Sequence, residues 1–522
     1  MSDQTTNGAN RMGWTAQQEA VFEWLSTPGH NRNLLVRARA GTGKTTTIIE
    51  GLRHAPEVKE GGRTLLAAFN KRIATELQSR APAGVAVKTL HSVGLAAITA
   101  AWGRCTIDNG RGKMLAGALI QPHMPVGFAY ANSPNPAMRK SPDAQLFTSA
   151  VTVVAKLAGV GKRTLCDDAR ELARAAWLYE AEAGPALIAA GWPTLRLAGI
   201  ATEAMAAAAK RSTMVDFDDM LWVPHAAGLA PASHDLVVID EAQDMNAAQL
   251  ELAISAAARG GRVVVVGDDR QAIYGFMGAA AGALDRTKDR LDADELRLSV
   301  TFRCPARVVA AARVYVPDYE AAPNAPAGVV DTLPMDKALP LIGGADFVLS
   351  RTNAGAVGAC LALLRHGTRA TVLGRDVGAS IKARVRGFGV DSIASVIVAA
   401  REWLTNERAQ AEAADRPERA DRAGDMCETI IVLAEGLTTV AALLERIDGL
   451  FDETAAGRVA CSTVHKSKGL EARKVWVMAE TFKDRPSLEE ENLRYVAMTR
   501  ALIELHVVGG PGAFKAPLEA AT

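Results

Sequence analysis

A glycine-rich segment between a strand and a helix constrains the fold of this chain more than any other feature. Residues Ala38 to Thr45 read Ala-Arg-Ala-Gly-Thr-Gly-Lys-Thr; they follow the apolar run 33–36 and precede a helical pattern over 46–52. Glycines let backbone N–H groups curl around phosphate oxygens, and the N-terminus of the next helix adds partial positive charge. Although Ala38 stands where the strict motif has its first glycine, the segment predicts a P-loop that binds and hydrolyses a nucleoside triphosphate.

Two side chains of this segment and two that follow a later apolar run have predicted roles in phosphate chemistry. We expect Lys44 to reach the β- and γ-phosphates and the Thr45 hydroxyl to take one place on Mg²⁺. Asp240 and Glu241 end the apolar run 236–239. A carboxylate at that point can hold Mg²⁺ through water, and the next one can polarise the attacking water. The sequence therefore predicts Asp240 as a metal ligand and Glu241 as a catalytic residue.

A third loop follows another apolar run, over 262–266. Because the carboxyl ends of parallel strands open on one crevice, this loop should face the same nucleotide. Gln271 is predicted to contact the γ-phosphate or its attacking water, as a catalytic sensor of the nucleotide. Tyr274 and Phe276 come next, and beside such a loop they suit base stacking, worth about 1–3 kcal/mol per base.

The alternation of short apolar runs with helical patterns predicts an α/β fold in two halves, each holding a mainly helical insertion. At 522 residues the chain is also too long for one compact core. We predict a first α/β domain over 1–94 and 214–292, with a first insertion over 95–213. We predict a second α/β domain over 293–377 and 458–522, with a second insertion over 378–457. The predicted strands are 33–36, 64–68, 236–239, 262–266, 345–349, 369–373 and 474–478.

Composition excludes several classes of protein. Lys and Arg number 59 against 58 Asp and Glu, a net charge of +1, so any nucleic-acid contact must come from a local groove. The six cysteines include no CxxC pair, which predicts reduced thiols and neither a zinc site nor an iron–sulfur cluster. The polar first residues are not a signal peptide, and no run reaches about 18 apolar residues. We expect a soluble cytoplasmic protein, and the alanine-rich composition favours a bacterial or phage-infected cell.

In their order along the chain, these motifs resemble those of the UvrD/Rep-like DNA helicases of superfamily 1, which translocate 3′ to 5′. The resemblance spans about residues 15–508, and it implies two RecA-like P-loop NTPase domains. Segments 349–353 and 490–493 look most like those of F-box DNA helicases and phage-encoded relatives. The segments that carry the resemblance are 37–45, 68–71, 89–92, 240–244, 267–279, 301–303, 463–471 and 495–501.

The resemblance implies an ATP site shared by both domains. Arg303 and Arg500 would reach the γ-phosphate from the second domain, where their charge offsets the charge that develops during phosphoryl transfer. Phe302 would stack on the adenine and Glu471 would contact the ribose. Gln18 would read the adenine, with Gln17 as the alternative register. The predicted ATP-binding residues are therefore Gln18, Ala38, Arg39, Ala40, Gly41, Thr42, Gly43, Lys44, Thr45, Thr46, Phe302 and Glu471.

The resemblance also implies a single-stranded DNA track. Phe276 stands where many relatives have Trp, which preserves stacking, whereas Met277 stands where they usually have Arg, so one contact is lost or replaced. The segment 216–219 is assigned a structural or coupling role. The predicted DNA contacts are Asn70, His91, Tyr274, Phe276 and His465.

These features predict a monomeric ATP-dependent helicase or translocase that moves 3′ to 5′ on single-stranded DNA. Its partners would be ATP, Mg²⁺, single strands, junctions with duplex, and proteins of replication, recombination or repair. The second insertion is short for this family, which puts processive unwinding in doubt. One alternative is a regulatory P-loop subunit of a recombination complex. A second alternative is that the protein moves along RNA rather than DNA.

Overall fold

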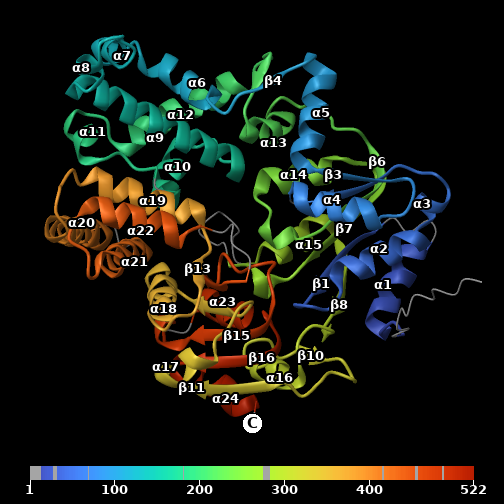
Figure 1. Cartoon of the computed structure of the whole chain (residues 1–522). Coiled ribbons are helices and arrows are strands. Elements are labelled where there is room, and N and C mark those ends of the chain that lie inside the picture. The colour runs from blue at the N-terminus through green and yellow to red at the C-terminus, as the bar shows by residue number, and fades with distance from the viewer. Residues whose placement is uncertain are drawn as a thin grey trace, which may run out of the picture.

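The computed structural model describes residues 13–27, 32–68, 70–179, 181–273, 282–413, 417–452, 457–484 and 487–521. Over these residues the chain forms two six-stranded parallel sheets, and each sheet is interrupted by a mainly helical insertion (Figure 1). This arrangement confirms the predicted fold class.

The first sheet has the strand order β3-β2-β6-β7-β1-β8. Successive residues of a strand point to opposite faces: Leu35 and Val237 enter one core, and Leu34 and Val238 enter the other. Burial on both faces explains why the central strands read as unbroken apolar runs. The strands are β1 (Asn33–Ala38), β2 (Thr64–Ala68), β3 (Val85–Thr89), β6 (His234–Ile239), β7 (Ala257–Gly267) and β8 (Ala293–Leu298).

One edge of this sheet differs from the predicted domain division. Strand β8 pairs with β1 in parallel, with Ala293 opposite Asn33 and Leu298 opposite Ala38. Residues 293–298 therefore lie in the first sheet, although we predicted that the second domain begins at 293. The helices beside the first sheet are α1 (Ala16–Ser26), α2 (Lys44–His54), α3 (Pro56–Lys59), α4 (Lys71–Arg80), α14 (Ala247–Ser255) and α15 (Ala283–Leu291), with short 3-10 turns at Ala242–Asp244 and Asp269–Gln271.

The first insertion runs between β3 and β6 and shares one hydrophobic core with the sheet. Its two short strands, β4 (Thr106–Ile107) and β5 (Met214–Val215), pair in parallel near its two ends. Its helices are α5 (Leu90–Trp102), α6 (Arg111–Ile120), α7 (Pro125–Ala131), α8 (Pro136–Arg139), α9 (Pro142–Thr164), α10 (Ala169–Ala175), α11 (Pro185–Ala189), α12 (Thr194–Ala208) and α13 (Phe217–Ala226), with a 3-10 turn at Ala176–Tyr179.

Helix α9 is long and apolar enough, by length and composition, to cross a membrane, which the sequence did not predict. Half of its apolar window (50%) is buried inside the structure. Phe147, Val154 and Leu157 on this helix belong to the core that the insertion shares with the first sheet. Packing inside the protein therefore accounts for its apolar character.

The second sheet has the order β11-β16-β15-β12-β14-β13, and its neighbouring strands pair in parallel. Its strands are β11 (Val329–Leu333), β12 (Phe347–Ser350), β13 (Ala370–Val372), β14 (Val459–Thr463), β15 (Ala472–Met478) and β16 (Ala501–Val508). A small parallel pair, β9 (Val300–Thr301) and β10 (Glu320–Ala321), follows directly after the first sheet. The other elements of this half are α16 (Ala306–Ala312), α17 (Met335–Ala338), α18 (Asn353–Arg365), α23 (Leu488–Met498) and α24 (Lys515–Ala521), with 3-10 turns at Leu339–Leu341, Ala479–Thr481 and Gly512–Phe514.

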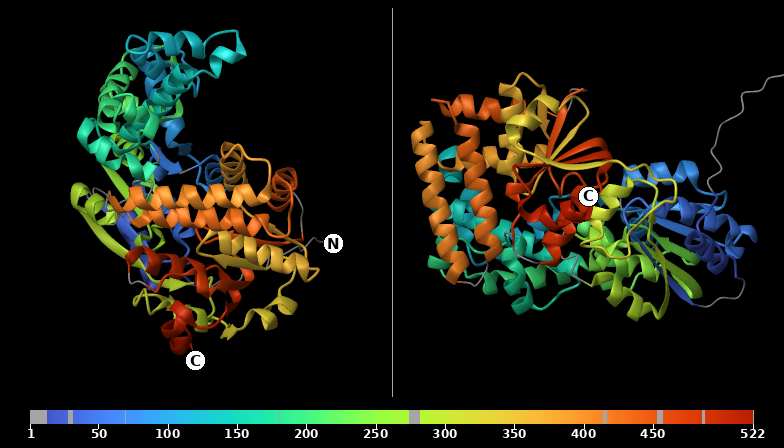
Figure 2. Two further views of the ribbon diagram at one scale, coloured as in Figure 1. Left: turned by 90° about the vertical axis from the view of Figure 1, so that its left-hand side faces the viewer. Right: turned by 90° about the horizontal axis from the view of Figure 1, so that it is seen from below.

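The second insertion consists of α19 (Arg375–Gly387), α20 (Ile393–Ala413), α21 (Pro417–Ala434) and α22 (Val440–Leu450). These helices lie beside the helices of the first insertion (Figure 2). Arg419 forms an ion pair with Glu182, and Arg422 donates to the carbonyl of Leu178 at 3.3 Å. The two halves of the molecule therefore also touch through their insertions.

Candidate active site

The glycine-rich segment connects β1 directly to α2. Gly41 and Gly43 have φ angles of 71° and 78°, a left-handed region that glycine adopts at little cost. A Cβ atom on Gly41 would lie 2.4 Å from the Cβ of Arg303, so this position has no room for a side chain. The segment therefore forms a tight backbone ring at the N-terminus of α2, which suits an anion.

The ends of three adjacent strands bring the predicted phosphate-site side chains together. Strands β6, β7 and β1 are neighbours in the sheet. Lys44 Nζ donates to both carboxylate oxygens of Glu241, at 2.9 and 2.8 Å, and Thr45 Oγ1 donates to Asp240 Oδ2 at 3.1 Å. Glu241 itself has a φ of 53°, a conformation that costs a non-glycine residue about 1–2 kcal/mol. The backbone thus holds this carboxylate against Lys44 despite local strain.

Charge is divided unequally between the two carboxylates. Burial raises the pKa of Asp240, and the adjacent charge of Glu241 raises it further. Burial would also raise the pKa of Glu241, but the Lys44 ammonium outweighs burial and holds that pKa below its usual range. Asp240 and Thr45 together offer the hard oxygen donors that Mg²⁺ prefers. A cation binding there would displace the proton that burial favours on Asp240.

Gln271 is buried behind these groups and reaches them through other side chains. Its Nε2 donates to Asp268 Oδ2 at 2.7 Å. Gln243 donates to Glu241 at 2.6 Å and accepts from the Asp268 backbone N–H at 3.0 Å. Gln243 and Asp268 therefore connect the predicted sensor to Glu241, the predicted catalytic carboxylate. Both residues stand inside the motifs quoted above, but we assigned neither of them a role from the sequence.

One arginine of the second domain lies against the P-loop, and a second arginine lies near the first. The stem of Arg303 lies against Gly41, and its guanidinium pairs with Glu471 at 2.8 Å. Arg500 is 1% exposed and donates to the carbonyls of Val496 and Leu470 and to the Thr499 hydroxyl. Burial, with the nearby charge of Arg303, lowers the pKa of Arg500 to about 10. A buried cation whose hydrogen-bond acceptors, among the described residues, are neutral oxygens suits an incoming anion.

The residues predicted for the adenosine surround the start of α2. Gln18 forms a capping box with Thr15 and donates to Thr47 Oγ1 at 3.1 Å. The Phe302 ring is 39% exposed, while its backbone N–H donates to the Gly41 carbonyl at 2.9 Å. Gln17, the alternative register, instead bonds Ser299 through both its amide oxygen and its amide nitrogen. Phe302 therefore lies beside Gly41 of the P-loop, and Gln18 lies beside Thr47 of α2.

The structure gives the remaining P-loop residues local partners. Thr42 Oγ1 donates to the carbonyl of Arg39 at 2.9 Å. Thr46 accepts a hydrogen bond from Arg80 at 2.8 Å. Ala38 ends β1 and is fully buried. These contacts stabilise the loop and leave the α2 N-terminus for phosphate.

A lysine and an asparagine of the second domain contact the first domain behind the P-loop. Lys468 Nζ donates at 2.6 Å both to Asp244 Oδ1 and to the carbonyl of Gln271. Asn492 donates to the carbonyl of Ala272 at 3.1 Å. The loop after β7, which carries Gln271, therefore makes two hydrogen bonds with the second domain. We did not assign either residue a role from the sequence.

The predicted DNA contacts are spread over both domains. Asn70 is exposed, and it also caps α4 by accepting from the Ile73 N–H at 2.9 Å. The His91 ring packs edge-on against Phe217 with centroids 5.5 Å apart, and Phe217 is 50% exposed. Tyr274 and Phe276 lie outside the described residues.

The segment 216–219, for which we expected a structural or coupling role, caps the start of α13. Asp216 and Asp219 form a capping box for α13. Lys162 pairs with both carboxylates, at 3.2 and 2.7 Å, and Arg111 pairs with Asp219. These pairs hold Phe217 rigidly at the start of α13. From the sequence we did not consider Phe217 as a contact residue, although an exposed aromatic side chain is a sign of binding.

His465 is predicted to make the stability of the protein depend on pH. Burial, with the nearby charge of Arg351, lowers its pKa to about 4. Between about pH 6.5 and 4 the unfolded chain therefore binds a proton that the folded chain does not. As the pH is lowered through this range, the free energy of unfolding falls by up to about 3 kcal/mol. When the free energy of unfolding is measured with denaturant between pH 6.5 and 4, the His465→Asn variant should not show this loss. The exposed His366→Asn variant is the control, and equal pH slopes in wild type and His465→Asn would contradict the prediction.

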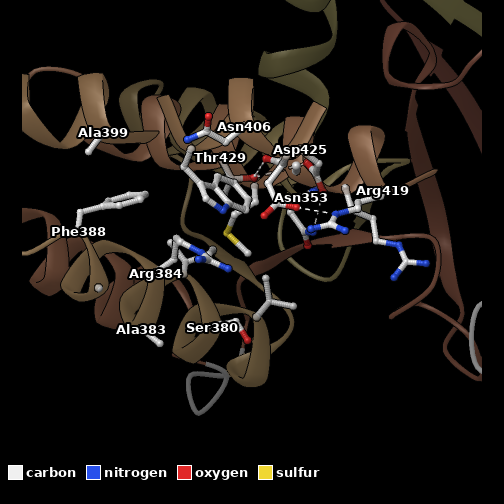
Figure 3. Close-up of a pocket in the computed structure, with 18 of the residues that line it drawn as sticks. Asn353, Ser380, Ala383, Arg384, Phe388, Ala399, Asn406, Arg419, Asp425 and Thr429 are labelled. Carbon is white, nitrogen blue, oxygen red and sulfur yellow. Dashed lines mark hydrogen bonds and ion pairs between the residues drawn. The ribbon is translucent and has the colours of Figure 1, made fainter. Parts of the chain in front are cut away.

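A cavity of about 1100 Å³ lies between the two insertions (Figure 3). Its walls include Trp177 from the first insertion and Phe388 from the second. The guanidinium of Arg384 lies 4.4 Å from the centroid of the Trp403 ring. None of the described residues assigned to ATP lines this cavity, so it is separate from the phosphate site.

Two family models match this chain, one in its first half and one near its C-terminal end. Residues 15–292 match the family model of the UvrD/REP helicase N-terminal domain. Residues 458–508 match that of the UvrD-like helicase C-terminal domain. The first match covers more than half of the chain and includes the P-loop, β6 and β7.

Individual relatives match over shorter parts. F-box DNA helicase protein 1 of Schizosaccharomyces pombe is 26% identical over an alignment of 295 residues, and the match covers 53% of this chain and 30% of the relative. ATP-dependent DNA helicase UvrD2 of Mycobacterium tuberculosis is 30% identical over an alignment of 317 residues, and that match covers 53% of this chain and 40% of the relative. DNA helicase II of Escherichia coli is 30% identical over 118 residues, 21% of this chain and 16% of the relative. The chain therefore matches less than half the length of each of these relatives.

Proposed function

The chain belongs to the UvrD/REP helicase family, and on this premise we propose that it is an ATP-dependent DNA helicase that moves 3′ to 5′ along single-stranded DNA. The observation that supports this proposal most is the meeting of two α/β domains over one P-loop. Arg303 of the second domain lies against Gly41 of the P-loop, Arg500 lies near Arg303, and Lys44 pairs with Glu241 at the start of α2. Hydrolysis at such a site can be coupled to movement between the domains.

Each charged side chain has a task in hydrolysis. Lys44 binds the β- and γ-phosphates, and Glu241, released from Lys44, accepts hydrogen bonds from the attacking water. Arg500 and Arg303 stabilise the charge that develops on the γ-phosphoryl group. Gln271 orients the water or senses the γ-phosphate through Asp268.

Asp240 and Thr45 would hold Mg²⁺ at the mouth of the P-loop. When bound, Mg²⁺ neutralises charge on the β- and γ-oxygens. The raised pKa of Asp240 has a consequence here: below its pKa the carboxyl is protonated and is a poor metal ligand. Metal affinity should therefore fall in mildly acidic solution.

The adenosine would lie between Phe302 and Gln18. Stacking on the exposed Phe302 ring needs no rearrangement of the P-loop, since the Phe302 backbone is already bonded to Gly41. Glu471 would contact the ribose once Arg303 leaves it for the phosphates. The pair is partly exposed, so it costs little to exchange.

Single-stranded DNA would run across both domains. We propose Phe217 and His91 as a stacking site on the first domain, because an exposed aromatic ring held rigidly by buried ion pairs can accept a base at little entropic cost. Asn70, His465, Tyr274 and Phe276 would supply the other contacts. The division into two RecA-like domains, with insertions over about 95–213 and 378–457, is part of this proposal, as are a monomeric state, a cytoplasmic site of action and a role in replication, recombination or repair.

The test of this function is ATP hydrolysis with and without nucleic acid at fixed salt, because binding to nucleic acid depends on salt. Single-stranded DNA should stimulate hydrolysis strongly, and Phe217→Ala should weaken that stimulation. RNA of the same sequence should stimulate less. A rate that DNA leaves unchanged would favour the alternative, a regulatory P-loop subunit.

Direction of movement needs a separate assay. Strand displacement should occur from duplexes with 3′ tails and not from those with 5′ tails. Displacement from 5′ tails alone would overturn the proposed polarity.

A further inference from the structure

The peptide groups around Ala40 in the P-loop are held from the second domain. The Ala40 N–H donates to the Tyr495 hydroxyl at 2.9 Å, and the Ala40 carbonyl accepts from the Tyr319 hydroxyl at 2.9 Å. The two phenol rings meet edge-on, with centroids 5.5 Å apart. Both tyrosines and Ala40 are fully buried, and all three belong to the hydrophobic core of the second domain.

The residues on each side of Ala40 are held in the same way. Arg39 forms a bidentate pair with Asp318, 3.0 Å at each contact, and also pairs with Asp268 and Asp269 of the first domain. The Gly41 carbonyl accepts from the Phe302 N–H. Three consecutive P-loop residues are therefore each bonded to the second domain. We call this set of contacts the P-loop clasp.

The second half of the P-loop is fixed differently. Lys44 and Thr45 begin α2, which packs on the first sheet through Ile48 and Leu52. The chain passes from the first sheet to the second domain between Leu298 and Val300, and Arg39 donates its backbone N–H to Leu298 there. The clasp thus lies beside the crossover between the domains. A rotation of the second domain would turn the Ala40 peptide while the start of α2 stays with the first sheet.

We propose that Tyr319 and Tyr495 are positioning residues that set the phosphate-binding shape of the P-loop according to the angle between the two domains. This inference rests on the proposed function, because it concerns the ATP that the same loop binds. A loop whose two halves belong to different domains changes its curvature when the domains move. ATP affinity then depends on domain angle, and movement along DNA and ATP binding become linked.

The test uses the full chain with Tyr495→Phe and Tyr319→Phe. Each change keeps the buried ring and leaves one polar group of Ala40 without its partner, which is costly when buried. Because the loop would relax away from its phosphate-binding shape in ground and transition states alike, KM for ATP should rise about tenfold while kcat stays within about twofold. Equilibrium binding of a fluorescent ATP analogue without DNA should weaken by the same factor.

Tyr315→Phe is the matched control. Tyr315 lies in the same segment and also donates to a backbone carbonyl, that of Ala513, at 3.2 Å, but inside the second domain. It should leave KM, kcat and nucleotide affinity within about twofold of wild type. If a tyrosine variant unfolds, Asp318→Asn tests the clasp through Arg39 and should also raise KM.

The outcomes separate the clasp from the function on which it rests. Unchanged nucleotide affinity in both clasp variants, or an equal change in Tyr315→Phe, overturns the clasp. A wild-type chain that binds the nucleotide but is not stimulated by DNA overturns the proposed function, while the affinity ratios still decide on the clasp. A wild-type chain that binds no nucleotide overturns both.

Discussion

Replacing Lys44 by alanine is expected to lower the DNA-stimulated ATPase rate by about 10²–10³-fold, the loss seen when one preorganised charge-stabilising donor is removed from an active site. Lys44 Nζ lies 2.8–2.9 Å from both oxygens of Glu241. Without the ammonium, phosphate loses its cationic partner and burial raises the pKa of Glu241. The variant should therefore lose both nucleotide charge stabilisation and the ionised state of its catalytic carboxylate.

Steady-state hydrolysis at saturating DNA measures this loss. Lys288→Ala is a suitable control, because Lys288 pairs with Glu295 of strand β8 at 2.9 Å and not with Asp240 or Glu241. It should retain wild-type kcat. Retained hydrolysis in Lys44→Ala would remove the P-loop from the mechanism.

Replacing Arg500 by methionine is expected to lower kcat about 10³-fold without lowering the stability of the fold. An arginine that offsets transition-state charge contributes at least that factor. Its pKa of about 10 shows that the folded protein disfavours the charged form, chiefly through burial. Below pH 10 this penalty is fully present, and it amounts to about 3 kcal/mol against an unfolded pKa of 12.5. A methionine of similar length removes that penalty.

Thermal unfolding and ATPase rates together test this second prediction. Arg500→Met should melt at or above the wild-type temperature. Arg303→Met should also lose activity, but its partly exposed pair with Glu471 contributes little to stability, so its melting temperature should stay near that of wild type. A marked drop in melting temperature for Arg500→Met, with kcat retained, would assign Arg500 a structural role instead.

Strands buried on both faces could be predicted from the sequence, and strands with other surroundings could not. Strand β1 and the end of β6 are unbroken apolar runs because helices cover both faces of the sheet. Edge strand β8 reads Ala-Asp-Glu-Leu-Arg-Leu, and its charged residues pair with side chains around the P-loop strand. Strand β14 carries Ser462 and Thr463, which are buried next to polar neighbours. Neither pattern differs enough from a loop for the sequence alone to identify it.

The phosphate site was more predictable than the contacts between the domains. Motif order along the chain places Lys44, Asp240 and Gln271 after strands that share one edge, so their proximity follows from the α/β fold. The bond from Ala40 to Tyr495 joins residues 455 apart in the chain. Such a contact depends on how two complete domains pack, and no local pattern encodes it.

The contact between the insertions has a geometric consequence. Besides the contacts around the P-loop and Lys468, the two halves of the molecule are joined by the chain itself, near Leu298, and by the insertions where Arg419 meets Glu182. Two bodies attached at two separate points can turn relative to each other only about the line through those points. If the contacts around the P-loop opened while the Arg419–Glu182 contact held, the two halves would keep one rotational degree of freedom, about the line through these two points. Loss of that contact would turn the hinge line into a single pivot and allow the halves to swing apart in any direction.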